Sequence, residues 1–179
     1  LYEALRQEAV SNVSDSAPGA ARSFRILAEI TRLRRFCCHP SLVIADSTLP
    51  GSKLQAFTAL VEELLENGHR ALVFSQYVDH LSIVRTLLDE KRIAYQYLDG
   101  SIPAKERERR VNAFQAGEGE IFLISLKAGG SGLNLTAADY VIHLDPWWNP
   151  AVEDQASDRA YRIGQQRPVT IYRLVAENS

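Results

Sequence analysis

The strongest constraint on the fold of this chain is a regular alternation between short apolar runs and amphipathic segments. Short apolar or β-branched runs predict strands at 71–74, 95–98 and 121–124, a strand that ends in Asp145, and a last strand at 169–175. Apolar residues at helical spacing predict helices at 53–66, 79–92 and 104–115. A run that is apolar throughout, as 121–124 is, suits a strand covered on both faces. The alternation therefore predicts a three-layer α/β fold, with a mainly parallel sheet between helices and right-handed crossovers.

Composition fits one domain of this kind with an N-terminal extension. The 179 residues are 46% hydrophobic and 23% charged, which suits a soluble chain with room for one core. We expect a helical extension over residues 1–50 and the α/β domain over residues 51–179. The sequence shows no secretory signal and no long apolar span, so we expect no membrane partner and an intracellular location. The chain begins at Leu1 and contains no methionine, which indicates a fragment of a longer protein.

The charge balance argues against a global attraction to nucleic acid. Lys and Arg number 20 against 22 Asp and Glu, a net charge of -2, so any DNA contact must be a local patch. The densest basic cluster surrounds a predicted helix at 24–36, where Ile26, Ile30 and Leu33 form an apolar stripe. Its arginines are Arg22, Arg25, Arg32, Arg34 and Arg35. The cluster is a solvated helix face or a docking surface for a neighbouring domain, and we favour these over direct DNA contact.

The only two cysteines are adjacent, at Cys37 and Cys38. Neighbouring cysteines cannot build a disulfide framework, and they fit a reducing compartment. The CCHP string has no second ligand pair at usable spacing, so we expect no metal site.

A glycine-rich loop directly follows the apolar run 121–124. Lys127 opens it, and Gly129, Gly130 and Gly132 follow. Glycines permit close backbone approach and positive φ, so the loop can offer N–H groups to a phosphate. A plain tight turn explains the same residues equally well.

The segment after Asp145 predicts a helix with an unusual polar face. Asn149 can cap this helix and Gly164 can end it. Gln155, Arg159 and Arg162 then fall at i, i+4 and i+7, on one face. That face is either solvated or binds an anion. Two adjacent guanidinium groups favour a triphosphate as that anion.

Three segments of this region resemble motifs V, Va and VI of the Swi/Snf-type DNA translocases, in helicase superfamily two. They are SLKAGGSGLNL, ADYVIHLDPWWNP and EDQASDRAYRIGQ. Upstream, RALVFSQY resembles motif IV and LDGSIPAKERERRVNAF resembles motif IVa, so the resemblance spans essentially the whole chain. It implies a C-terminal RecA-like lobe over residues 51–179, and a linker from the first lobe over residues 1–50.

For ATP, the resemblance implies a shared site. The chain contains no GxxxxGK[ST] motif, and its one DExx-like string, Asp89–Arg92, ends a predicted surface helix. ATP and Mg²⁺ should therefore be bound mainly by the absent first lobe, and the isolated chain should be inactive as an ATPase. By resemblance, Arg159 and Arg162 act as arginine fingers. The matching nucleotide-interface residues are Gln155, Gly132 and Asn134.

For DNA, the resemblance implies contacts with the phosphates of one strand of a duplex. The matching residues are Gln76, Ser101, Ser125 and Lys127. Trp148 matches a tryptophan that the family places against DNA, whereas Trp147 is expected to pack in the fold. The implied partners are the N-terminal RecA-like lobe and double-stranded DNA, with a DNA-bound protein left open. A bacterial cytoplasm or a eukaryotic nucleus fits equally well.

Two other functional classes compete with this interpretation. One is a non-catalytic protein-interaction module that retains the lobe fold. The polar row formed by Gln155, Arg159 and Arg162 argues against it, because a lobe without catalysis has no use for such a row. The other is a small-molecule Rossmann enzyme, but the glycine loop lacks the GxGxxG order and a helix that opens on it.

Overall fold

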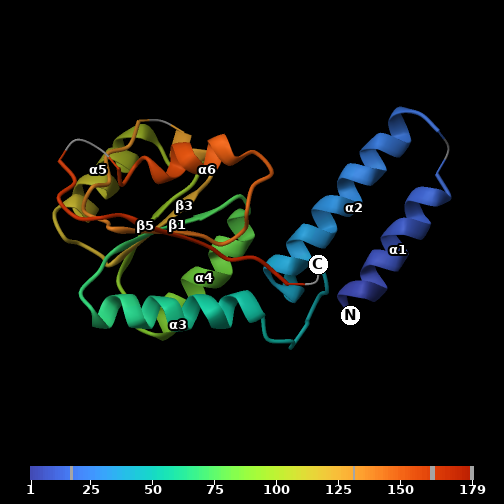
Figure 1. Ribbon diagram of the computed structural model, residues 1–179, viewed down its shortest axis with the longest axis horizontal. Coiled ribbons are helices and arrows are strands. Elements are labelled where there is room, and N and C mark those ends of the chain that lie inside the picture. The colour runs from blue at the N-terminus through green and yellow to red at the C-terminus, as the bar shows by residue number, and fades with distance from the viewer. Residues whose placement is uncertain (17, 131, 162–163, 178–179) are drawn as a thin grey trace. The chain divides into compact units, whose positions relative to one another are not determined.

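The chain folds into two units. The computed structural model describes residues 1–16, 18–130, 132–161 and 164–177 (Figure 1). One unit comprises Leu1–Leu54 together with the end of the chain from Ala176, and the other is Gln55–Val175. Among the described residues, no helix is both long enough and apolar enough to cross a membrane.

The first unit is built on two helices, α1 (Tyr2–Ser14) and α2 (Ala20–Cys38), followed by a 3₁₀ turn, η1 (Pro40–Leu42). Polar contacts join α1 to α2. Arg32 of α2 donates to both carboxylate oxygens of Glu8 at 3.1 Å. Helix α2 also leaves large apolar residues in solvent, with Phe24 exposed by 74% and Leu27 by 61%.

The second unit contains a five-stranded, all-parallel sheet in the order β2-β3-β1-β4-β5. The strands are β1 (Ala71–Ser75), β2 (Tyr95–Leu98), β3 (Ile121–Ser125), β4 (Tyr140–His143) and β5 (Thr170–Arg173). Central strands β1 and β3 are buried at every position, as a sheet covered on both faces requires. The predicted α/β class and parallel sheet are confirmed.

Helices cover both faces of this sheet. They are α3 (Ser52–Glu66), α4 (Val78–Glu90), α5 (Ala104–Gln115) and α6 (Pro150–Ser157), with a short 3₁₀ turn, η2 (Ala128–Gly130), after β3. Figure 1 shows α3 and α4 on one side of the strands and α5 and α6 on the other. This arrangement gives the three layers that the alternation predicted.

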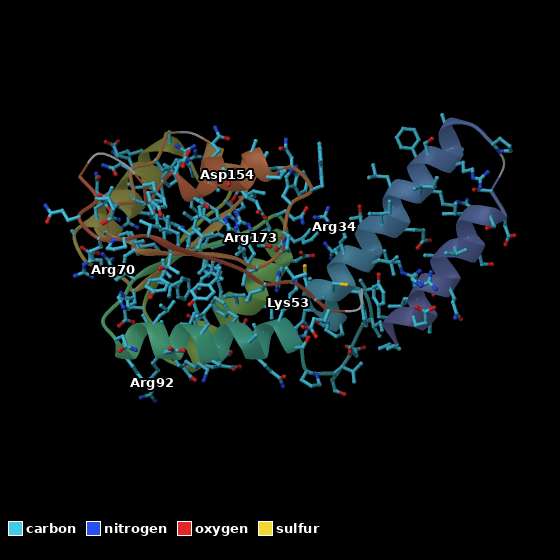
Figure 2. The ribbon with its side chains drawn as sticks, viewed as in Figure 1. Arg34, Lys53, Arg70, Arg92, Asp154 and Arg173 are labelled. Carbon is cyan, nitrogen blue, oxygen red and sulfur yellow. The ribbon has the colours of Figure 1, made fainter. Side chains whose placement is uncertain are left out.

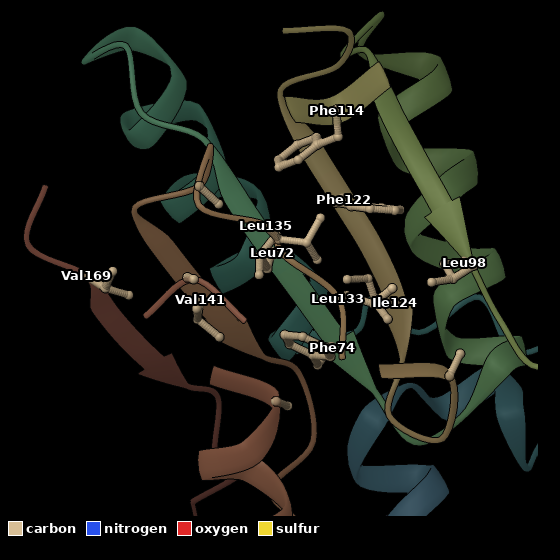
Figure 3. Packing of buried hydrophobic residues seen from close by; sticks show 14 residues of the cluster. Leu72, Phe74, Leu98, Phe114, Phe122, Ile124, Leu133, Leu135, Val141 and Val169 are labelled. Atoms are coloured by element: carbon tan, nitrogen blue, oxygen red, sulfur yellow. The ribbon is translucent and has the colours of Figure 1, made fainter. Parts of the chain in front are cut away.

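One hydrophobic cluster of the second unit lies between the sheet and the α5 and α6 layer. Leu72 and Phe74 of β1 and Phe122 and Ile124 of β3 point into it, and Phe114 of α5 covers them (Figure 3). The Phe114 and Phe122 ring centroids are 5.2 Å apart. Each large side chain of this kind contributes about 1.5–3 kcal/mol when fully buried. The core fixes the sheet, and the sheet fixes the loops at its ends.

Candidate functional site

The candidate DNA residues meet at one edge of the sheet. Because all five strands are parallel, their carboxyl ends share an edge, which is where open α/β sheets place their ligands. Gln76 follows β1, Ser101 follows β2, Lys127 follows β3 and Trp148 follows β4. The structure thus gathers these residues in neighbouring loops, although they are widely separated in sequence.

A buried carboxylate, that of Asp145, joins the loops that follow β1 and β4. Asp145 accepts a hydrogen bond from Ser75 Oγ at 2.5 Å and another from Gln76 N at 2.9 Å. The ring of His80 lies close by, with Nδ1 3.5 Å from Asp145 Oδ1. The strand predicted to end in Asp145 ends at His143 instead, and Asp145 lies in the loop beyond. Its carboxylate therefore fixes the backbone of Gln76.

A second carboxylate organises the loop after β2. Asp99 Oδ1 accepts from Ser101 N at 2.8 Å and from Ser101 Oγ at 2.6 Å, and Tyr97 Oη donates to Oδ2. Burial acts to raise the pKa of Asp99, but the hydrogen bonds from Ser101 and Tyr97 outweigh burial and lower it. Burial and the bond to Asp99 raise the pKa of Tyr97 to about 12. Both Ser101 donors already serve Asp99, so a phosphate contact from Ser101 would have to replace these bonds.

Ser125 is not placed for the expected DNA contact. Its side chain is buried, with 4% exposed, and its hydroxyl accepts from Ala128 N at 3.3 Å. The strand runs one residue further than predicted, and the hydroxyl stabilises the turn into η2. The DNA contact predicted for Ser125 stays a prediction, and because the side chain is buried here its hydroxyl would have to be uncovered to donate to a phosphate. Lys127, two residues later, is exposed.

The glycine loop is partly a packing device. A Cβ added at Gly129 would lie 3.2 Å from Cε1 of Phe74, so this glycine lets η2 pack closely on β1. Gly132 has φ +57 and open space around it, so it serves the backbone conformation instead. The tight-turn interpretation thus accounts for Gly129, and Gly132 and Asn134 remain exposed in the loop.

Helix α6 is shorter than predicted. Asn149 caps it as expected, accepting from Ala151 N at 3.1 Å, but the helix ends at Ser157 rather than near Gly164. Beyond Ser157 the bonds tighten to the 3₁₀ pattern, with Ala160 N donating to Ser157 O. The carbonyl of Arg159 accepts from Leu135 N at 3.1 Å, a contact that a continuing helix would not leave open.

This ending separates the predicted polar row. Gln155 is exposed on α6, whereas Arg159 is 4% exposed in the turn beyond it. The prediction that Gln155 and Arg159 project from one helix face is wrong. Arg162 lies outside the described residues. The Leu135–Arg159 bond does bring the turn of Arg159 next to the segment that carries Gly132 and Asn134.

The two tryptophans after β4 differ as expected. Trp148 is 76% exposed, and Trp147 is partly buried, with its backbone N donating to Glu153 Oε1 at 2.9 Å. Glu153 is itself buried and accepts from Arg173 Nε at 2.7 Å. Figure 2 labels Arg173 on the strand side of α6, where it also lies 3.7 Å from exposed Asp154. Glu153 thus fixes the loop that presents Trp148.

Sequence reasoning missed the three carboxylates that build these loops. Asp99 and Asp145 lie just past strand ends, and Glu153 lies in the first turn of α6. Their signal was available, since buried acidic residues at such positions commonly accept hydrogen bonds from loop N–H groups.

Comparison with known proteins agrees with this architecture. Residues 52–164 match the family model of the helicase conserved C-terminal domain. The Bacillus subtilis protein YwqA is 41% identical over 182 residues, which cover 98% of this chain and 20% of YwqA. A mouse SWI/SNF-related matrix-associated actin-dependent regulator of chromatin, subfamily A member 1, is 37% identical over 179 residues, covering 92% of this chain and 17% of the mouse protein. This chain therefore spans about a fifth of the length of these relatives.

A solved structure contains a lobe with a similar fold. The Sulfolobus solfataricus SWI2/SNF2 ATPase core in complex with double-stranded DNA matches with a TM-score of 0.81 and 34% identity. The match covers 97% of this chain and 37% of the Sulfolobus chain. The chain belongs to the helicase conserved C-terminal domain family, and within it to the Swi/Snf type, whose C-terminal RecA-like lobe it forms.

Proposed function

We propose that this chain is the second motor lobe of an ATP-dependent translocase on double-stranded DNA. The observation that carries the proposal is the gathering of Gln76, Lys127 and Trp148 in loops at the carboxyl edge of one parallel sheet. The Sulfolobus ATPase core, which shares this lobe, is in complex with double-stranded DNA. Contacts to phosphates position a duplex without reading its sequence, which suits a motor that moves along any DNA.

The lobe contributes donors to a nucleotide site and leaves the metal to its partner lobe. Asp99 and Asp145, the carboxylates just past strand ends, are occupied by hydrogen bonds within the lobe. We therefore assign Mg²⁺ and the β- and γ-phosphates of ATP to the N-terminal RecA-like lobe of the parent protein. Gln155, Gly132 and Asn134, all exposed, face the nucleotide from this side.

Arg159 and Arg162 are the proposed arginine fingers. Such residues accelerate phosphoryl transfer by about 10³- to 10⁵-fold where measured. Arg159 is 4% exposed here, so its guanidinium group must turn outward when the two lobes close on ATP. A finger that is withdrawn until closure would couple hydrolysis to the motion of the lobes.

The test uses Arg159→Ala and Arg162→Ala in the full-length parent. We expect each to lower the DNA-stimulated ATPase rate by about 10³-fold or more, with DNA affinity nearly unchanged. Arg167→Ala is the matched control, because the Arg167 side chain is 65% exposed and its Nη1 lies 3.5 Å from Asp139 Oδ2. Wild-type ATPase rates for both finger variants would remove the motor assignment.

A non-catalytic interaction module is the second candidate. The exposed apolar side of α2, with Phe24 and Leu27 beside Arg32 and Arg35, is the observation that favours it. The two candidates differ in the parent protein, since a motor hydrolyses ATP in the presence of DNA and an interaction module does not. The isolated chain should be inactive under both.

A further inference from the structure

Gln165 makes an unusual set of contacts for a residue next to a proposed catalytic turn. The two hydrogens of its side-chain Nε2 are shared among three backbone carbonyls, those of Thr136 at 3.0 Å, Ala138 at 2.8 Å and Ala160 at 3.1 Å. Its Oε1 accepts from Arg167 N at 3.0 Å. Both ends of one amide are therefore used inside the fold. Gln165 is not among the residues proposed to contact DNA or ATP.

The three carbonyls belong to two separate segments. Thr136 and Ala138 lie in the segment that enters β4, and Ala160 lies in the turn after α6. Ala138 and Ala160 are fully buried and belong to the core cluster. Gln165 is thus a bridge that joins the turn after α6 to the entry of β4.

A second bridge joins the same two segments one residue earlier. Leu135 N donates to Arg159 O at 3.1 Å, and the Gln165 amide holds the neighbouring carbonyl, that of Ala160. Two successive carbonyls of the turn are therefore held: Leu135 N binds the carbonyl of Arg159, and Gln165 Nε2 binds that of Ala160. The backbone from which the Arg159 side chain extends is held at both points.

We propose that Gln165 is a positioning residue for Arg159, an inference that rests on the arginine-finger role proposed above. An arginine finger works only when its guanidinium group meets the developing charge with close geometric accuracy. Gln165 fixes the backbone position of Arg159, so that only rotations about the side-chain bonds of Arg159 are needed when the lobes close. A misplacement of about 1 Å is enough to cost about 100-fold in rate.

The chemistry of the site explains why glutamine suits it. A glutamate has the same shape but no donor, and its carboxylate would face three carbonyl oxygens. A methionine has a similar length and no charge, so it removes the donor without adding repulsion. Gln166 is the natural control, because it is the adjacent residue, has the same side chain and is exposed.

The experiment compares Gln165→Glu and Gln166→Glu in the full-length parent. We expect Gln165→Glu to lower the DNA-stimulated kcat about 100-fold, with KM for ATP and Kd for DNA within about twofold of wild type. Gln166→Glu should match wild type in all three. A purely structural role would instead lower the amount of folded protein and leave kcat per folded molecule unchanged. Should Gln165→Glu fail to fold, Gln165→Met replaces it, and failure of both to fold would overturn the proposal.

A double-mutant cycle separates this inference from the proposed function. Arg159→Lys keeps a positive charge, so a residual rate stays measurable. If Gln165 acts through Arg159, adding Gln165→Glu to Arg159→Lys should lower kcat by a much smaller factor than in wild type. An equal factor in both backgrounds would overturn the positioning role alone. A wild-type kcat for Arg159→Lys and for Arg159→Ala would instead overturn the finger assignment.

Discussion

Single carboxylates control the loops at the carboxyl edge of the sheet. Asp145 joins the loops after β1 and β4 through Ser75 Oγ and Gln76 N, and Asp99 holds Ser101 by two hydrogen bonds. Removing the Asp145 carboxylate takes away the acceptor of the buried Ser75 hydroxyl, and a buried donor left unsatisfied costs about 1–3 kcal/mol. These residues therefore define the shape of the proposed DNA surface without contacting DNA.

One buried histidine gives the lobe a pH dependence. His143 Nε2 lies 3.0 Å from Ser157 Oγ, and its ring stacks on Phe74 with centroids 5.5 Å apart. Burial lowers the pKa of His143 below its usual value of 6.5, more than the nearby carboxylates of Glu153 and Asp145 raise it. Because the unfolded chain then binds the proton first, stability should fall as the pH drops below about 6.5 toward the folded-state pKa.

The measurement is urea unfolding of wild type and His143→Gln at pH 7.5 and pH 5.5. Wild type should lose stability between these values, by at most about 1.4 kcal/mol per pH unit from this one group. His143→Gln should be less stable at pH 7.5, since it loses the ring stacking, but its stability should change less with pH. Asp99, whose pKa is lowered, adds to the loss only at more acidic pH. Parallel pH dependence in the two proteins would contradict the assignment to His143.

At the scale of elements, η2 depends on close packing at Gly129. An alanine Cβ at Gly129 would lie 3.2 Å from Phe74 Cε1 and 3.8 Å from Ile124 Cγ2. Overpacking of this kind costs about 1–3 kcal/mol, so Gly129→Ala should lower the free energy of unfolding by roughly that amount. The loop that carries Lys127 would shift with it.

Gly100→Ala supplies the comparison for this prediction. No atom lies within 4 Å of a Cβ added at Gly100, so alanine there should be neutral or slightly stabilising. Both variants are measured by urea unfolding of the 179-residue chain. Equal stabilities for Gly129→Ala and wild type would show that Phe74 moves aside at no cost.

The elements also show what the sequence could predict. Strand β2 (95–98) and helix α5 (104–115) were predicted with their bounds, because apolar periodicity is a local signal that the fold leaves unchanged. The end of α6 was not predictable in this way. It depends on Leu135 N, which captures the carbonyl of Arg159 from a distant part of the chain. The burial of Ser125 and Arg159 follows from such tertiary contacts, which a local sequence pattern does not report.

At the scale of the whole molecule, the sheet separates two edges with different roles. Helices run antiparallel to the strands they follow, so Lys127 lies at the carboxyl edge and Lys91, after α4, lies toward the amino edge. The net charge of -2 provides no general attraction to DNA. Under the proposed function, the DNA affinity that this lobe contributes comes from the few cations placed at the carboxyl edge, and each should be visible in the salt dependence of binding.

Lys127→Ala in the full-length parent tests this separation. DNA affinity should fall, and the slope of log K against log salt should become shallower by about 0.9, the value for one lost phosphate contact on duplex DNA. Lys91→Ala should leave both quantities unchanged, because Lys91 lies away from the proposed DNA surface. Its Nζ forms an ion pair with Glu62 Oε1 at 2.6 Å. Affinity is measured by titration of a labelled duplex at several salt concentrations. A shallower slope for Lys91→Ala and an unchanged slope for Lys127→Ala would place DNA on the opposite edge, because counterion release reports which cation meets a phosphate whatever the sequence of the DNA.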